Sequence, residues 1–283
     1  MEEDMVMKKI LILFTLILII AGCGKKITEA DKLNQKGIDN YFRENYRLAL
    51  DMFNQAISLD PSDAKKYNNR GLVLFCLGDY EKSLEDYDKA LELKPDFPEV
   101  YNNRAMTFVS LEKYPEAIKD YTKIIESTPN DQELYYNRGE AFYKSKQYEN
   151  AIADFKTAIK IYPNFTHAYN NLGMTYLEQG DLLNASDAFN RVITIDPRNI
   201  QGYINLARLN YDAGDYEGCV YNCDNALNED KRTYEAYMNK GIALEKLKKN
   251  SEAIKAFENY LEYAPETDEY RSLAMDKIAA LKR

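Results

Sequence analysis

Apolar and small residues recur along most of the chain with a helical period. Counted from residue 64, they occupy the fourth, eighth and eleventh positions, and then the twentieth, twenty-fourth and twenty-seventh. Spacings of three and four residues place side chains on one face of an α-helix. The turn-forming pairs Gly78-Asp79, Gly180-Asp181 and Gly214-Asp215 separate the two sets. The pattern therefore predicts hairpins in which an amphipathic helix A is joined by a tight turn to an amphipathic helix B.

This pattern repeats every 34 residues without insertion or deletion. A proline, which cannot continue a helix, follows helix B at Pro61, Pro95, Pro129, Pro163, Pro197 and Pro265. Lys231 occupies the one vacant position of this series. The predicted repeats, numbered one to seven below, are 30–63, 64–97, 98–131, 132–165, 166–199, 200–233 and 234–267. Because one hairpin cannot bury its apolar face alone, we expect an all-α solenoid, formed by a single elongated array of seven stacked hairpins.

The residue types at fixed positions of the repeat carry a family resemblance. The fourth position is usually Tyr, the eighth Gly or Ala, the twentieth a small residue and the twenty-fourth an aromatic residue, as in Tyr135, Gly139, Ala151 and Phe155. Small residues at the eighth and twentieth positions let helices A and B approach closely. This arrangement resembles the tetratricopeptide repeat over residues 30–267. The resemblance implies that the A helices line a concave face that binds a protein or an extended peptide.

The chain after the last repeat, residues 268–283, has an apolar stripe at Tyr270, Leu273, Ala274, Ile278 and Leu281. We interpret it as a capping helix that covers the open end of repeat seven.

Repeat six departs most from the pattern. Cys219 and Cys223 stand where Ala and an aromatic residue are usual, and Asn210 replaces an apolar residue at the eleventh position. These changes predict a thinner core and a softer joint. The two Cys share a helix face with no His or third Cys beside them, so we favour small buried hydrophobic residues over a metal site.

The N-terminal residues read as a targeting segment. Residues 10–21 are apolar except for Thr15, too short a stretch to span a bilayer, which needs roughly 20 residues. Lys8 and Lys9 precede it, as in a secretory signal, and Met7 is a hypothetical start that gives a cleaner basic region than Met1. We therefore expect a signal peptide over residues 1–22.

The segment ends in small residues followed by Cys23. This resembles the lipobox of bacterial lipoproteins, which implies attachment of lipid, including fatty acyl chains such as palmitate, to Cys23 and a short linker over 23–29. An ordinary secretory signal with an incidental Cys is the alternative. By the same resemblance, Gly24 rather than Asp after the Cys favours the outer membrane of a bacterial envelope. Two or more acyl chains make a stable anchor.

Composition narrows the possible functions. The net charge of −9 argues against nucleic acid as a partner, because phosphate binding requires a basic face. His167 is the single His, and the sequence shows no nucleophile–base pair, metal cluster or phosphate-binding loop. We expect a protein that is not an enzyme and that uses no cofactor or metal.

The candidate binding residues lie on helix A. The sixth position is nearly uniform, and the residues there after Gln35 are Asn69, Asn103, Asn137, Asn171, Asn205 and Asn239. An Asn amide offers both a donor and an acceptor, which complements a peptide group. Two interpretations stay open: a ladder that grips an extended peptide by its backbone, or packing between successive A helices. Apolar neighbours that would assist a ladder are Tyr41, Phe75, Met106, Tyr136, Tyr143, Met174 and Tyr211. Arg70, Arg104 and Arg138 recur at the seventh position, and we interpret them as structural.

The sequence thus predicts a lipid-anchored scaffold of the bacterial envelope that binds a protein or peptide and assists assembly of an envelope complex. The alternative is a surface-exposed lipoprotein that contacts a host or ligand. The partner, the envelope process, the membrane leaflet and the oligomeric state are left open.

Overall fold

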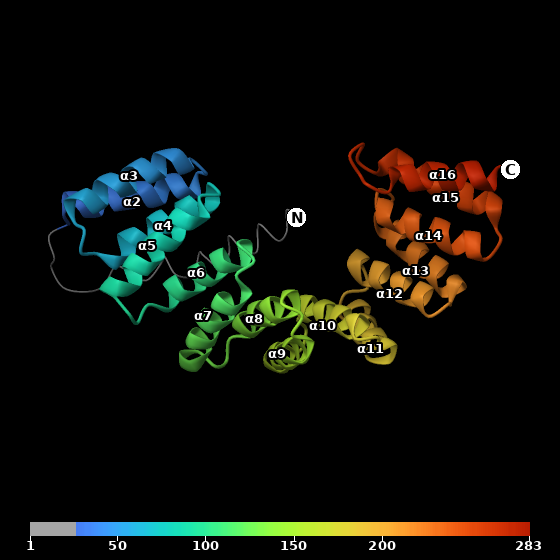
Figure 1. Cartoon of the computed structure of the whole chain (residues 1–283), viewed down its shortest axis with the longest axis horizontal. Coiled ribbons are helices and arrows are strands. Elements are labelled where there is room, and N and C mark those ends of the chain that lie inside the picture. Colours follow the sequence, from blue (N-terminus) through green and yellow to red (C-terminus); the bar gives the residue numbers. More distant parts are fainter. Residues whose placement is uncertain (1–26) are drawn as a thin grey trace. The chain divides into compact units, whose positions relative to one another are not determined.

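The structure is a computed structural model that describes residues 27–283, and this part of the chain consists of helices without strands (Figure 1). The expected all-α repeat architecture is confirmed. The signal peptide, Cys23 and most of the linker lie outside the described residues. The A helices are α2 (Glu29–Phe42), α4 (Ala64–Cys76), α6 (Pro98–Ser110), α8 (Gln132–Lys144), α10 (Thr166–Glu178), α12 (Ile200–Asp212) and α14 (Tyr234–Lys246). The B helices are α3 (Tyr46–Leu59), α5 (Tyr80–Leu93), α7 (Tyr114–Ser127), α9 (Tyr148–Ile161), α11 (Leu182–Ile195), α13 (Tyr216–Glu229) and α15 (Asn250–Tyr263), and α16 (Arg271–Leu281) follows them.

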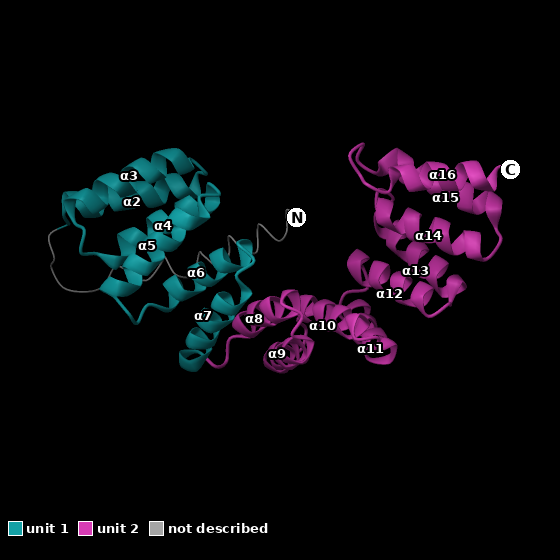
Figure 2. Cartoon of the chain, viewed as in Figure 1, with its two compact units in different colours: residues 1–128 teal, residues 129–283 magenta. Residues whose placement is uncertain are grey.

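The chain divides into two compact units, residues 1–128 and 129–283 (Figure 2). The repeat pattern alone predicted one continuous array. In stacked repeats each hairpin contacts only its neighbours, so no single core holds the whole stack together. We describe each unit by itself: unit 1 holds hairpins α2 to α7, and unit 2 holds hairpins α8 to α15 with α16.

In each hairpin, the turn between helix A and helix B contains one residue with a left-handed backbone conformation. Gly78, Gly180 and Gly214 adopt φ of 77° to 82°, which glycine tolerates without strain. Four hairpins adopt the same turn with a charged residue instead: Glu44, Glu112, Lys146 and Lys248, at φ of 57° to 62°. The sequence pattern identified only the glycine turns, because nothing in a Glu or Lys marks a left-handed residue.

Close helix approach within a hairpin rests on the pairing of the eighth and twenty-fourth positions. A Cβ added to Gly139 would lie 2.7 Å from the Phe155 ring, and one added to Gly71 would lie 2.7 Å from the Tyr87 ring. Phe155 and Tyr87 are fully buried. The small residues therefore let an aromatic ring of helix B pack directly on the backbone of helix A, as the sequence indicated.

Within each unit the A helices pack more closely together than the B helices. In unit 1, α4 contacts both α2 and α6, and in unit 2, α10 and α12 each contact the A helices on either side. Successive B helices make at most marginal contact within the described residues. Each stack therefore curves toward its A helices, whose side chains line its inner side.

Helix α16 caps the last hairpin, but the predicted stripe is only partly right. Ala274 is buried, and Ile278 and Leu281 pack beside it against the core of the last hairpin. Tyr270 and Leu273 are 52% and 41% exposed. The reason is register: residues 274, 278 and 281 share one face at spacings of four and three, while Leu273 lies one residue off that face and Tyr270 precedes the helix.

Candidate functional site

The asparagine row of the A helices forms hydrogen bonds between successive repeats. Within unit 1, Nδ2 of Asn69 donates to Oδ1 of Asn34 at 3.1 Å, and Nδ2 of Asn103 donates to Oδ1 of Asn68 at 3.0 Å. These bonds join the sixth position of one repeat to the fifth position of the repeat before it. The packing role of the row is therefore physically present.

The same pattern recurs in unit 2. Nδ2 of Asn171 donates to the Tyr136 hydroxyl at 3.1 Å, and Nδ2 of Asn205 donates to Oδ1 of Asn170 at 3.1 Å. Asn205 also accepts a bond from Gln201 through Oδ1. By contrast, Oδ1 of Asn69, Asn103 and Asn171 accepts no hydrogen bond from any residue between 27 and 283. The groups of this row that remain available to a ligand are therefore mainly the Oδ1 acceptors. Asn137 and Asn239 occupy the same register, half-buried.

The predicted apolar neighbours are held by packing and remain partly accessible. Tyr136 packs against Phe155, Phe165 and His167 with ring centroids 5.2–6.5 Å apart. Tyr143 and Tyr211 each contact the aromatic residue five positions later, at 5.9 and 5.4 Å. Tyr41 and Phe75 make the same kind of contact, with Tyr46 and Tyr80 at 5.8 and 5.4 Å. Met106 and Met174 are half-buried. These side chains form a pre-ordered apolar lining, which reduces the entropy lost when a ligand binds.

Repeats two, three and four share a charged clamp between their two helices, made by the arginine of the seventh position. Arg104 donates from Nε and Nη2 to the two carboxylate oxygens of Asp120, at 2.7 and 2.8 Å. Arg70 with Asp86 and Arg138 with Asp154 repeat this geometry. Burial raises the pKa of the Asp86 carboxyl, and the bonds from Arg70 oppose that rise. The arginines are structural, as interpreted; their partner at the twenty-third position escaped the sequence analysis, although its offset of 16 residues recurs three times.

A buried lysine is a second feature that the sequence analysis missed. Lys66 on α4 is fully buried, and its Nζ lies 2.8 Å from carboxylate oxygens of Asp60 and Asp63 and 3.8 Å from Asp31. Burial alone would lower the pKa of Lys66, but the bonds to Asp60 and Asp63 raise it. Its hydrogen bond to Asp60 lowers the pKa of that carboxyl to about 2. The cluster ties α2, the loop after α3 and the start of α4 together.

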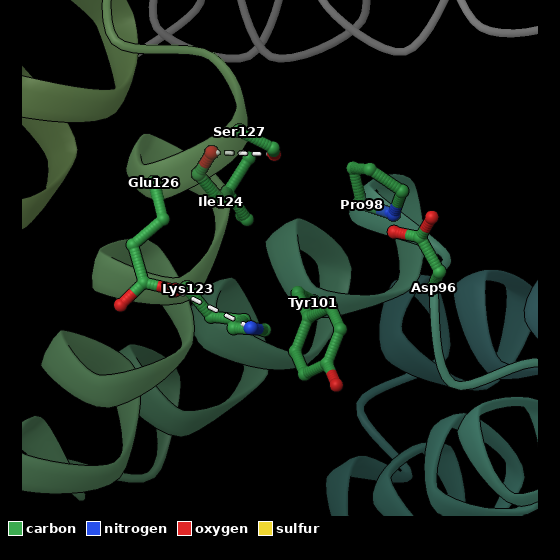
Figure 3. A pocket seen from close by; sticks show the side chains of 7 residues that line it. All are labelled: Asp96, Pro98, Tyr101, Lys123, Ile124, Glu126 and Ser127. Atoms are coloured by element: carbon green, nitrogen blue, oxygen red, sulfur yellow. Dashed lines mark hydrogen bonds and ion pairs between the residues drawn. The ribbon is translucent and has the colours of Figure 1, made fainter.

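A small pocket of about 250 Å³ lies in unit 1 between the start of α6 and the end of α7 (Figure 3). Asp96 and Tyr101 approach it from the side of α6, and Lys123 and Glu126 from α7, as Figure 3 shows. Two of its three charged side chains pair with each other, since Lys123 Nζ lies 3.3 Å from a carboxylate oxygen of Glu126.

A second hollow of about 310 Å³ lies in unit 2, lined by α11, α12 and α13. It opens beside the positions where repeat six departs from the pattern. Its lining residues are Ser186, Asn190, Ile193, Tyr203, Leu206, Asn210, Gly218, Tyr221, Asn222 and Asn225. Cys219 and Cys223, by contrast, are buried in the core of this hairpin.

Between residues 27 and 283, no group of three or more His, Cys, Asp or Glu is placed to hold a metal ion. No helix in this range is long and apolar enough to cross a membrane.

Comparison with known families agrees with the hairpin geometry. Models described as tetratricopeptide repeat match residues 64–97, 86–119, 167–199 and 234–267, and a model described as TPR repeat matches 106–146 and 139–180. Together these segments cover more than half of the chain. The chain belongs to the tetratricopeptide repeat family. The interval between the matched segments, residues 200–233, is repeat six. No curated protein is a significant match.

Solved tetratricopeptide repeat structures share the fold. A repeat protein from Parabacteroides merdae has a TM-score of 0.68 at 18% identity, over 90% of this chain and 99% of its own. PilW, described as a type IV pilus biogenesis factor, has a TM-score of 0.64 at 19% identity, over 73% of this chain and 96% of its own. YrrB, described as having an unusual peptide-binding site, has a TM-score of 0.53 at 26% identity, over 65% of this chain and 95% of its own. The tetratricopeptide repeat fold implies a protein or peptide partner.

Proposed function

We propose that this tetratricopeptide repeat protein is a lipid-anchored scaffold of the bacterial envelope, and that it holds an extended segment of a partner along its A helices. Its role is binding rather than catalysis. The observation that carries the proposal is the asparagine row of the A helices, in which Oδ1 of the half-buried Asn69, Asn103 and Asn171 accepts no hydrogen bond from residues 27–283.

The row fits an extended peptide in spacing and in chemistry. Packed helices lie about 8–10 Å apart, and an extended chain rises about 3.3 Å per residue, so successive asparagines meet one peptide unit in every three. Because the Nδ2 groups of Asn69, Asn103 and Asn171 already bond the neighbouring A helix, each carbonyl oxygen would accept from a peptide N–H.

Hydrogen bonds alone do not hold a flexible segment. One net hydrogen bond contributes about 1 kcal/mol, while ordering a residue costs about 1–2 kcal/mol. The partner must also bury apolar side chains against Met106 in unit 1 or against Tyr143, Met174 and Tyr211 in unit 2. The partner segment we propose is therefore extended and carries apolar residues at intervals.

The membrane anchor is supported by the sequence alone. The apolar stretch, the basic start and Cys23 resemble a lipoprotein signal. PilW is described as a type IV pilus biogenesis factor, which agrees with a role in assembly of an envelope complex. The outer membrane is favoured by Gly24, which follows Cys23 where Asp would favour the inner membrane. YrrB is described by its peptide-binding site, which agrees with peptide capture. The alternative, a lipoprotein displayed on the cell surface, predicts digestion by protease added to intact cells, whereas an inward-facing scaffold predicts protection.

Site-specific photo-crosslinking in membranes tests the binding face. A benzophenone amino acid replaces Tyr143 on the A helix α8, or Tyr162, which lies just after the B helix α9 and is 48% exposed. We expect a discrete adduct from position 143 and none from position 162, which is the matched control. Adducts from position 162 alone, or equally from both, would overturn the proposed face.

The anchor is tested separately. The Cys23→Ser variant should lose incorporation of a labelled fatty acid and move from the membrane to the soluble fraction. Retention in the membrane with the label still attached would contradict lipidation at Cys23 without bearing on the crosslinking result.

A further inference from the structure

The hollow at repeat six has no role in the function proposed above, because it lies apart from the A-helix face. It lies between two B helices and the A helix α12, within unit 2. Its volume of about 310 Å³ falls at the lower end of the roughly 300–1,000 Å³ typical of small-molecule sites.

Departures from the repeat pattern create this hollow. Asn210 stands at the eleventh position, where repeats two and seven have the buried Leu74 and Leu244. Gly218 lies against it, and a Cβ there would come within 2.2 Å of Asn210 Nδ2. The same Cβ would lie 2.1 Å from Asp215 Oδ2, so Gly218 leaves room for the Asn210 amide and the Asp215 carboxylate in the positions they occupy.

The lining is uncharged and rich in unpaired hydrogen-bonding groups. None of the lining residues is charged, in a chain whose residues are 29% charged. Asn222 is 8% exposed; its Nδ2 donates to the Gly218 carbonyl, and its Oδ1 has no partner between residues 27 and 283. The side-chain amide of Asn225 has no partner in the same range, and the side chain of Asn190 bonds only the Ser186 hydroxyl, through Nδ2. Water still reaches Asn222 Oδ1, because the buried side-chain atoms without a partner between residues 27 and 283 are Tyr87 OH and Asn102 Oδ1. A ligand hydroxyl can therefore take the place of that water on the amide oxygen.

An aromatic side chain stands at the hollow. Tyr221 is 67% exposed, and the other repeats have Asp51, Glu85, Lys119, Ala153, Asp187 and Lys255 at its register. An exposed aromatic ring among these residue types offers an apolar platform beside the amides.

We propose that this hollow binds a neutral sugar of mono- or disaccharide size. Hydroxyl groups both donate and accept, so they match amides that still have donors and acceptors free. The apolar C–H face of a sugar ring packs on Tyr221. The Asp215 carboxylate, which accepts from Gly218 N–H and Asn210 Nδ2, disfavours an anionic ligand. An extended peptide fits less well, because it rises about 3.3 Å per residue and needs a groove longer than the hollow at one repeat junction.

Saturation-transfer NMR on the full 283-residue chain tests the proposal. The probes are glucose, galactose, mannose, N-acetylglucosamine, cellobiose, lactose and chitobiose, with acetyl-tetraalanine-amide as the neutral peptide comparator. We expect transfer to the ring protons of at least one sugar and none to the peptide.

Two variants test whether the sugar binds at the hollow of repeat six. Asn210→Leu restores the residue type of repeats two and seven. Tyr221→Lys installs the residue of repeat seven at a position that is 67% exposed, so it should leave folding unchanged. Both should weaken binding at least tenfold. Asn259→Ala, at the register of Asn225 in repeat seven, should leave it unchanged. No transfer to any sugar, transfer to the peptide alone, or a sugar signal that survives both variants would overturn the proposal.

Discussion

Repeats two to four and repeat six share one backbone hairpin but hold their helices together differently. In repeat three, Arg104 and the almost buried Asp120 clamp α6 to α7 with two short bonds. Repeat six has Leu206 and Asn222 at these two positions, Cys219 and Cys223 in its core, and a hollow at Asn210. The small residues that set helix approach keep the hairpin geometry in both. The difference lies in the side-chain contacts between helix A and helix B, which include the arginine–aspartate clamp in repeats two to four and lack it in repeat six.

The largest expected effect comes from removing one side of the clamp. Asp120→Ala leaves the Arg104 guanidinium, whose side chain is 19% exposed, without its main partner, and should lower the free energy of local opening by about 3 kcal/mol. Native-state hydrogen exchange of the α6 and α7 amides measures this free energy of local opening.

The control uses the same arginine. Asp88 also bonds Arg104, at 2.6 Å, but its side chain is 64% exposed. Asp88→Ala should therefore change the same quantity by less than about 1 kcal/mol. Equal losses for the two variants would contradict a clamp that draws its strength from burial.

Filling the hollow should stabilise repeat six. Asn210→Leu restores an apolar residue where Leu244 is buried in repeat seven, and should raise the free energy of local opening of α12 and α13 by about 1 kcal/mol. Exchange of the α12 amides reports the gain. A destabilised α12 would show that the hollow is closed to a leucine side chain.

The turns differ in backbone strain rather than in packing. Gly214 has φ of 80°, and an added Cβ would meet nothing within 4 Å, so Gly214→Ala should cost about 1 kcal/mol through strain alone. Glu112→Gly at φ of 57° relieves strain in repeat three, but it increases the entropy of the unfolded chain, so the gain should be about 0.5 kcal/mol or less. Urea unfolding of the two variants should move in opposite directions.

The smallest effect compares two loops at the same register. Asp60 accepts a bond from the buried Lys66, which lowers the pKa of this carboxyl to about 2. Asp230 accepts bonds from the backbone N–H and then the exposed guanidinium of Arg232, and these also lower its pKa. A carboxyl whose pKa is lowered by folding contributes stability above its ordinary pKa, and this stability is lost as the pH falls through the folded value. Acidification from pH 4 to pH 2 should therefore loosen the start of α4 more than the start of α14. Exchange measured at both pH values, corrected for intrinsic rates, tests this; equal loosening would contradict it.

The sequence predicted much of the fold because its period is unbroken. The hairpins, the small residues at Gly71 and Gly139 and the solenoid architecture follow from positions that every repeat uses in nearly the same way. The apolar stripe predicted for α16 was wrong at Tyr270 and Leu273. A short helix outside the 34-residue period has no second copy in the sequence from which its buried face could be fixed.

The site was less predictable. The asparagine row was found, but not its bonds to the preceding repeat, because they join residues 35 apart that no local pattern connects. The clamp partner Asp120 and the buried Lys66 look like ordinary surface charges in a sequence. Asn210 was the one sign of the hollow in the sequence. The uncharged lining comes from residues of α11, α12 and α13 that only the fold brings together.

Repeat six combines the lack of the clamp of repeats two to four with a hollow at Asn210, and it should therefore open more easily than those repeats. Hydrogen exchange of the unmodified full chain, read peptide by peptide, tests this most directly because every hairpin is measured in one sample. We predict that α12 and α13 exchange faster than the clamped hairpins α4–α5, α6–α7 and α8–α9. Exchange in any clamped hairpin as fast as that in α12 and α13 would contradict the account.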